Sequence, residues 1–293
     1  MLSIVIPIYN QDVRKLVDTL MKQCQKLDIN FQILCFDDCS EPKYRKLNKE
    51  LAFRINVNYT EMAENLGRSR IRNWLGKAAY FDNILFLDGD TVIKNRNFIK
   101  TYVDYLPTEH ILCGGRNYSL KPPRSKKKLL HWRYGSKRES LPSKKRNKDP
   151  YINFHSNNFI IPEKLFKDHL FDENVKGYGY EDLLYAFDLK KSGVNIVHID
   201  NPTLHDGLEV NTMFIKKTKN AIENLAMLYK QKKIPHTRLI KSYEKLKEWD
   251  MLKAFQWYYA RVSDNIDANL LSDNPSVFKF NLWKLHLFIE NMY

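Results

Sequence analysis

The sequence predicts an α/β fold, in which a mostly parallel β-sheet is flanked by helices and followed by a helical C-terminal extension. Three observations lead to this prediction. Short runs of β-branched and apolar residues alternate with segments of helical spacing from Leu2 to Leu87. Two of these runs end directly in paired carboxylates, and from Asn211 onward only helical spacing remains. Strands that alternate with helices imply right-handed crossovers and therefore a parallel sheet.

The elements expected in the first part of the chain follow one another regularly. Apolar runs too short for a helix predict strands, and apolar side chains three to four positions apart predict helices. In chain order they are a strand at 2–10, a helix at 11–27, a strand at 31–36, a helix opened by Pro42, a strand at 54–59, a helix at 66–79 and a strand at 84–87.

The second part of the chain continues this pattern and then changes. A helix is expected at 97–106, strands at 111–113, 152–162 and 194–199, and a helix from Glu181 onward. Beyond these, all spacing is helical, and Asn274-Pro275 supplies a cap and a first-turn proline for the last helix. We therefore expect a catalytic domain at 1–210 and a helical extension at 211–293. The last helix suits packing on the rest of the chain, a dimer contact or a membrane interface.

The composition limits the classes of protein to which this chain can belong. A hydrophobic fraction of 43% is that of a folded globular chain. No apolar run is long enough to cross a bilayer, and the N-terminus lacks the pattern of a secretory signal. The four cysteines show neither paired nor zinc-like spacing and are expected to be reduced thiols. These features favour a cytoplasmic protein.

One segment makes the chain basic. Of the formal net charge of +14, the stretch 121–148 contributes most, with 12 Lys and Arg residues against Glu139 alone. Because prolines interrupt it, we expect a mobile loop over 119–150. Its charge suits a solvated surface, a single-stranded nucleic acid or an anionic membrane, on whose inner face the protein would be peripheral.

The chemistry is expected where two strands end. Asp88-Gly89-Asp90 follows one strand directly, and Asp37-Asp38 follows another. Ligands of open α/β sheets bind beyond the carboxyl ends of the strands, and two carboxylates there suit a hard divalent cation that also holds a phosphate. Each pair also suits an ordinary turn or a helix cap. Taken together, the two pairs predict one site at one edge of the sheet.

Five motifs follow one another along the chain: Ser3–Asn10, Asp37-Asp38-Cys39-Ser40, Asn65-Leu66-Gly67 with Arg72-Asn73, Asp88-Gly89-Asp90 and Gly177-Tyr178-Gly179-Tyr180-Glu181-Asp182. Their order resembles that of the family 2 glycosyltransferases, which have the GT-A fold and invert the sugar. The resemblance covers roughly the first two-thirds of the chain. Cys39 stands where the family usually has glycine, and Thr91 where many members have a third Asp.

This resemblance implies roles for individual residues. Asp182 is expected to be the general base, with Glu181 orienting it or binding the acceptor, and Asn158 and Tyr180 are further acceptor ligands. Asp90, Asp88 and His205 are expected to hold Mn²⁺ or Mg²⁺. The nucleotide-diphosphate sugar donor is expected to bind Pro7, Tyr9, Asn10, Asp38, Gly67, Arg72, Asp88, Gly89 and Asp90.

The expected function is therefore transfer of a sugar, from a donor expected to be UDP-linked, to a hydroxyl of a glycan or lipid-linked acceptor. A metal-dependent nucleotidyltransferase remains an alternative, although the chain after Pro7 lacks a glycine-rich phosphate loop. A nucleic-acid-binding protein would explain the basic segment and leave the carboxylates without a purpose. An inactive scaffold of the same fold would be expected to have lost one carboxylate set. A homo-oligomer is compatible with all of these readings.

Overall fold

The computed structural model describes residues 1–175, 179–234 and 237–293. These form two compact units. The first, here called the sheet unit, comprises 1–117, 140–175 and 181–207, and the second, here called the helical unit, comprises the described residues of 118–139, 176–180 and 208–293.

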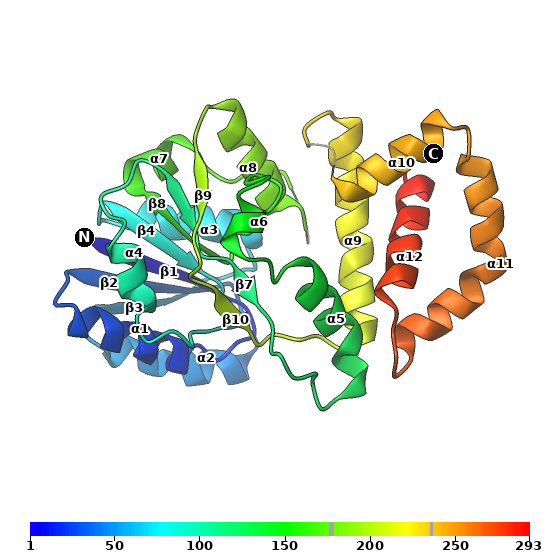
Figure 1. Ribbon diagram of the computed structural model, residues 1–293. Helices are drawn as coiled ribbons and strands as arrows, with labels where there is room; N and C mark the ends of the chain where they lie inside the picture. Colours follow the sequence, from blue (N-terminus) through cyan, green and yellow to red (C-terminus); the bar gives the residue numbers. More distant parts are fainter. Residues whose placement is uncertain (176–178, 235–236) are drawn as a thin grey trace. The chain divides into compact units, whose positions relative to one another are not determined.

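A seven-stranded sheet forms the centre of the sheet unit (Figure 1). Its first four strands in space are parallel, and β8 lies antiparallel to both of its neighbours. The spatial order is β3 (Val57–Glu61), β2 (Phe31–Asp37), β1 (Leu2–Ile8), β4 (Asn83–Leu87), β8 (Asn158–Pro162), β6 (Ile111–Cys113) and β9 (Ile196–His198).

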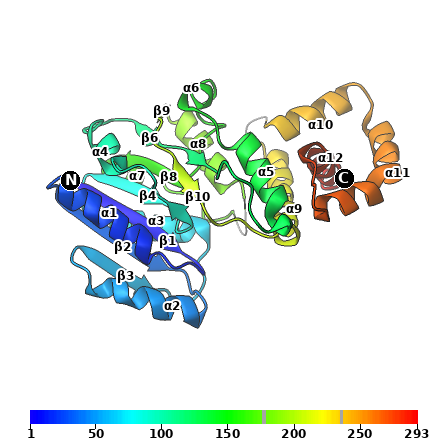
Figure 2. The same cartoon turned by 60° about the horizontal axis from the view of Figure 1, so that its bottom comes forward.

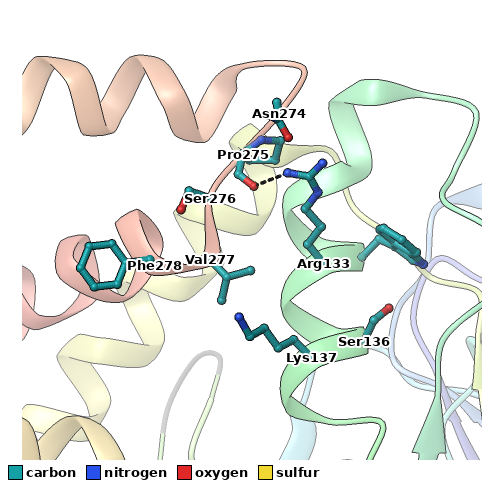
Figure 3. A pocket seen from close by; sticks show the side chains of 9 residues that line it. Arg133, Ser136, Lys137, Asn274, Pro275, Ser276, Val277 and Phe278 are labelled. Carbon is teal, nitrogen blue, oxygen red and sulfur yellow. Dashed lines mark hydrogen bonds between the residues drawn. The ribbon is translucent and has the colours of Figure 1, made fainter.

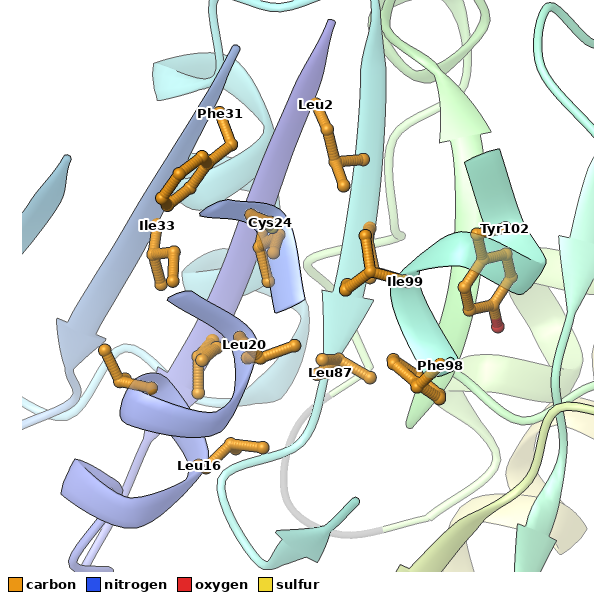
Figure 4. Packing of buried hydrophobic residues seen from close by; sticks show 14 of the residues in the cluster. Leu2, Leu16, Leu20, Cys24, Phe31, Ile33, Leu87, Phe98, Ile99 and Tyr102 are labelled. Atoms are coloured by element: carbon orange, nitrogen blue, oxygen red, sulfur yellow. The ribbon is translucent and has the colours of Figure 1, made fainter. Parts of the chain in front are cut away.

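Helices cover both faces of this sheet (Figures 1 and 2). On one face, α1 (Arg14–Lys26) and α4 (Phe98–Val103) pack against the inward side chains of the strands, as Figure 4 shows for Leu20 and Phe98. On the other face lie α3 (Arg68–Ala78), α7 (Glu163–Asp168) and α8 (Glu181–Lys191). The remaining helices of the unit are α2 (Pro42–Asn48), η1 (Lys49–Phe53) and α6 (Ser143–Arg146).

The two-sided cover explains the sequence of the strands. All seven residues of β2 are buried, and six of the seven residues of β1 are. A strand with helices on both faces buries both sets of side chains, so it is a continuous apolar run and does not alternate. Full burial of each Leu or Ile stabilises the fold by roughly 1.5–3 kcal/mol.

A second, three-stranded sheet lies beside the large one in the sheet unit. It joins β5 (Thr91–Val92), β10 (Thr203–His205) and β7 (Arg116–Asn117) in the order β5-β10-β7. Residues far apart in sequence become neighbours in it: His205 is paired with Thr91, and Thr203 with Arg116. The short strands carry little apolar surface, and sequence patterning does not predict them.

The helical unit contains η2 (Lys126–Lys128), α5 (Leu129–Arg138) and four longer helices. The helix α12 (Val277–Glu290) packs against α9 (Asn211–Lys230), α10 (Arg238–Glu248) and α11 (Leu252–Leu271), and it buries Phe280 and Phe288. Within the described residues, no helix is long and apolar enough to cross a membrane. All four cysteines are free.

The prediction of a loop over most of 119–150 is wrong. The segment forms η2 and α5 in the helical unit and α6 in the sheet unit. Leu129 and Leu130 are buried, which gives α5 an apolar face to pack within its unit. Arg146 at the end of α6 is also buried, where it donates to the carbonyls of Cys113, Gly114 and Ile199. Because lysines and arginines dominate this segment, its sequence does not show that Leu129, Leu130 and Arg146 are buried.

Candidate active site

The Asp38 carboxylate joins the end of β2 to the start of α3. Its Oδ1 accepts the N–H of Leu66 at 2.5 Å, and its Oδ2 accepts the N–H of Gly67 at 3.0 Å. Burial raises the pKa of Asp38, and these two backbone N–H groups oppose the rise. Gly67 has a φ of 80°, which favours glycine, and it leads directly into α3. Asp38 therefore fixes the helix start that was predicted to face the donor.

The exits of β1 and β2 are tied to each other. Asn10 donates its N–H to Ser40 Oγ, and its Oδ1 accepts the N–H of Glu41. Asp37 is fully buried and accepts the N–H of Ser40 and the hydroxyl of Tyr59. Asp37 thus shapes the turn, while Asp38 and Asn10 lie at the rim of the sheet edge.

Three arginines surround Asp88. Arg72 Nη2 donates to Asp88 Oδ1 at 2.7 Å, while Arg68 and Arg116 lie 3.7 and 3.6 Å from Oδ2. The Arg72 side chain is 2% exposed. Arg72 was predicted to bind the donor, but at this depth it cannot reach a ligand without rearrangement. It holds Asp88 in place instead.

Glu181 enters the same network from the N-terminal end of α8. Its Oε1 lies 2.9 Å from Arg68 Nε and 3.9 Å from Arg72 Nη1, and its side chain is 6% exposed. Arg68 therefore bridges a carboxylate at the end of β4 and one at the start of α8. This burial fits the predicted orienting role of Glu181 better than direct binding of the acceptor.

Asp90 lies beside His205 because of the small sheet. The pairing of His205 with Thr91 brings Asp90 Oδ2 within 3.4 Å of His205 Nδ1. Burial opposes ionisation of Asp90, but His205, Arg116 and Arg68 outweigh it and hold the pKa of Asp90 below its usual value. Asp90 Oδ1 is buried and accepts no hydrogen bond from any residue that the structure describes.

The structure brings Asp90 and His205 together, but not Asp88 with them. No group of three or more His, Cys, Asp or Glu side chains is placed to hold a metal ion in the described ranges. Asp88 instead contacts Arg72, Arg68 and Arg116, and its expected role as a metal ligand stays a prediction. Gly89 fits between the two aspartates because a Cβ there would lie 3.2 Å from the carbonyl oxygen of Pro7 and from Val13.

Asp182 pairs with a histidine from the loop before β8. Asp182 Oδ2 lies 3.6 Å from His155 Nδ1, and the two side chains are 26% and 36% exposed. Burial favours the protonated form of Asp182, but His155, Arg68 and Arg72 outweigh it and lower its pKa. Asp182 is thus an ionised carboxylate at neutral pH with access to solvent.

The other predicted ligands differ in accessibility. Tyr9 is 56% exposed at the end of β1, where a ligand can reach it. Asn158 is 1% exposed and occupied: its Oδ1 accepts Tyr102 Oη, and its Nδ2 donates to the carbonyls of Gly115 and Asn201. The prediction that Asn158 binds the acceptor is corrected, because this amide links strands in the interior. Tyr180 belongs to the helical unit and has a φ of 69°.

Part of the last motif lies outside the described residues, namely Gly177 and Tyr178. The sequence patterns assign no role to Arg68, Arg116 or His155. Arg116 follows a glycine pair at the end of β6, a position comparable to the other strand exits. This position at the end of a strand is the feature of the sequence that could have indicated a role for Arg116 in the site.

A comparison with protein families settles the class. The family "Glycosyl transferase family 2" matches residues 3–170, which is more than half of the chain. This protein is a family 2 glycosyltransferase. The membership decides in favour of a glycosyltransferase over the nucleotidyltransferase alternative. No curated protein sequence matches the chain.

Solved structures agree with the fold of the glycosyltransferase. A mannosyltransferase of Pyrobaculum calidifontis, solved with GDP-Man and Mn²⁺, has a TM-score of 0.57 at 13% identity, with 96% of this chain and 78% of that one covered. TarS residues 1–349 of S. aureus, solved with UDP-GlcNAc, has a TM-score of 0.52 at 18% identity, with 99% and 89% covered. Glucosyl-3-phosphoglycerate synthase of Mycobacterium tuberculosis, solved with Mn²⁺ and UDP, has a TM-score of 0.52 at 14% identity, with 80% and 81% covered. The predicted GT-A fold is confirmed.

Proposed function

We propose that this glycosyltransferase moves a sugar from a nucleotide-diphosphate donor, UDP-linked by preference, to a hydroxyl of a glycan or glycolipid acceptor, with inversion. The observation that carries the proposal is the position of Arg68. It contacts both Asp88 and Glu181, and its charge lowers the pKa of both Asp90 and Asp182. The influence of one cation on both carboxylates supports a single site for the metal and for proton transfer.

Asp90 and His205 fit a divalent cation. They offer one carboxylate oxygen without a hydrogen bond in the described structure and one imidazole, donor types that Mn²⁺ accepts. Mg²⁺ is typically held by one or two carboxylates together with substrate phosphates, so a complete cage of protein ligands is not required. Bound there, the ion would neutralise charge on the departing nucleoside diphosphate. The mannosyltransferase and the synthase solved with Mn²⁺ support this choice of ion.

The donor is proposed to lie along the exits of β1, β2 and β4. Asp38, held at the N-terminus of α3, would accept an N–H of the base through its remaining lone pairs. Arg68 and Arg116 lie beside Asp88, and their side chains are 36% and 17% exposed. Their guanidinium groups would bind the diphosphate. In this proposal they take the donor-binding role that the sequence analysis gave to Arg72.

Proton transfer is assigned to Asp182. Its ionised carboxylate would accept the proton of the acceptor hydroxyl as that oxygen attacks the anomeric carbon and the bond to the diphosphate breaks. General-base catalysis of this kind contributes roughly 10²–10⁴ in rate. His155 would orient the carboxylate that accepts the proton. Attack from the face opposite the leaving group gives inversion.

The test is hydrolysis and transfer with a panel of nucleotide sugars, with Mn²⁺ and with a chelator, for the wild type, Asp182→Asn and the control Asp188→Asn. Asp188 is an exposed carboxylate on the same helix as Asp182. We expect release of nucleoside diphosphate from one donor with metal, and loss of transfer to an added acceptor only in Asp182→Asn. The proposal fails if no donor is bound or consumed, or if both variants transfer equally well.

A further inference from the structure

The helical unit contains a pocket that the proposed chemistry does not use. It has a volume of about 600 Å³ and lies between α5 and the segment Asn274–Phe278 that leads into α12. All the residues that line it belong to the helical unit. Figure 3 shows Arg133 and Lys137 extending from α5 toward this segment.

Two cations, Arg133 and Lys137, line the pocket. Arg133 Nη1 donates to the carbonyl of Pro275 at 2.8 Å, a neutral acceptor that positions the guanidinium without cancelling its charge. No carboxylate in the part of the chain that the structure describes forms an ion pair with Arg133 or Lys137. Their neighbour Lys126 differs, since it pairs with Asp273 at 2.8 Å. Two uncompensated positive charges that face one recess favour an anion.

The rest of the lining suits a ring-bearing molecule. Trp132 and Phe278 contribute aromatic surface, and Ser136 contributes a hydroxyl that makes no hydrogen bond within the described residues. The Trp132 indole is fixed, because its Nε1–H donates to the carbonyl of Ser119 at 2.8 Å. Aromatic surface beside a few directed polar groups is typical of small-molecule sites. Such a wall can pack against the C–H face of a sugar.

The pocket is formed before any ligand arrives. Asn269 on α11 donates from Nδ2 to the carbonyl of Asn274 and accepts the N–H of Ser276 at Oδ1. The hydroxyl of Ser276 in turn accepts the N–H of Lys279. These hydrogen bonds hold the segment opposite α5 in place, so binding of a ligand would require little further ordering of this segment.

We propose that this pocket binds a sugar that carries a phosphate group. The proposal rests on the residues of the pocket alone and does not depend on the proposed transfer reaction. The two charges lie beside the aromatic side chains of Trp132 and Phe278 and the hydroxyl of Ser136, a combination that suits a sugar ring with an anionic group. The occupant is therefore a discrete anionic saccharide.

The experiment uses the full chain and glucose 6-phosphate as the probe, without any nucleotide sugar. The indole N–H resonance of Trp132, assigned with Trp132→Phe, reports on this pocket separately from the donor site. We expect glucose 6-phosphate to shift this resonance at concentrations where glucose and inorganic phosphate do not. Lys137→Glu is expected to raise the Kd about tenfold or more. Lys137→Arg is expected to retain binding.

The matched control is Lys253→Glu, which makes the same charge change at an exposed position on α11 outside the pocket. It should leave the Kd within about twofold. Equal weakening by both Glu variants, or equal binding of inorganic phosphate and glucose 6-phosphate, overturns the proposal. Preferential shift of the resonance by phosphatidylglycerol vesicles, lost in Lys137→Glu, also overturns it in favour of a lipid headgroup. Because no donor is present, none of these outcomes can be confused with failure of donor hydrolysis.

Discussion

Arg72 Nη2 lies 2.7 Å from Asp88 Oδ1, although the two residues belong to a helix and to the exit of a strand. The guanidinium also lies 3.9 Å from Glu181, and its side chain is 2% exposed. One buried cation therefore contacts two carboxylates of the proposed site. Such a group supports the site through charge placement and does not need to touch the substrate.

Replacing Arg72 by Ala should destabilise the fold by about 3 kcal/mol, because Asp88 would lose its 2.7 Å hydrogen bond to a buried cation while Arg68 and Arg116 remain beside it. The matched control is Arg70→Ala on the same helix. Arg70 is 42% exposed and lies 3.9 Å from Glu173, so its loss should cost less than about 1 kcal/mol. Urea unfolding of both variants measures the difference. Similar free energies of unfolding for the two would contradict the assigned role.

Loss of His205 should weaken metal binding. We expect His205→Ala to raise the Kd for Mn²⁺ at least about tenfold in the presence of UDP, because the ion would retain Asp90 as its one protein ligand. Asp206→Asn removes an exposed neighbouring carboxylate and should change the Kd little. Electron paramagnetic resonance of free Mn²⁺ gives both values. An unchanged Kd in His205→Ala would remove the histidine from the metal site.

Stability should fall between about pH 6.5 and pH 4 because of His198. Burial and Arg146 lower the pKa of His198 to about 4, while its Nδ1 accepts from Arg146 and its Nε2 donates to Pro150. Below about pH 6.5 His198 binds a proton in the unfolded chain, whereas in the folded chain it stays neutral until about pH 4. Because the unfolded state binds more protons in this range, lowering the pH favours unfolding. The effect of this one residue is about 2–3 kcal/mol at about pH 4.5.

The variant His198→Gln isolates this contribution, since Gln does not titrate. Urea unfolding at about pH 7.5 and about pH 4.5 should show a smaller loss of stability in the variant than in the wild type. His286, whose pKa is also lowered, contributes equally to both proteins and cancels in the comparison. An equal loss in both proteins would show that His198 is not the group responsible.

Cys39 has a φ of 61°, in the left-handed region that glycine adopts at lower cost. The substitution Cys39→Gly should therefore stabilise the protein by up to about 1 kcal/mol. Cys39→Ala keeps the Cβ and the strain, so it should show no such gain. Thermal unfolding of the two variants distinguishes backbone strain from loss of the thiol. A gain in both would assign the effect to the thiol.

The fold could be predicted from the sequence because its signals are local. The apolar runs of β1, β2 and β4, the helical spacing of α1 and α3, and the carboxylates at Asp38 and Asp88 all follow one another along the chain. Hydrophobic patterning fixes which residues are buried, and alternation of strands and helices fixes a parallel sheet. Cys39 departs from the family pattern in the sequence, and its φ of 61° explains why glycine suits this position.

The partners within the site could not be predicted, because they depend on pairings between distant segments. Strands of two or three residues place His205 beside Asp90 and Arg116 beside Asp88, and such strands have no periodicity to recognise. The burial of Arg72 and Asn158 likewise depends on how layers pack, since a polar side chain has the same sequence signature at the surface and in the interior. The sequence by itself determined the order of the elements, the GT-A class and the identity of Asp90 and Asp182 as candidates. Tertiary structure alone decided which charges meet, because the free energy of a buried ion depends on neighbours that only the folded chain supplies.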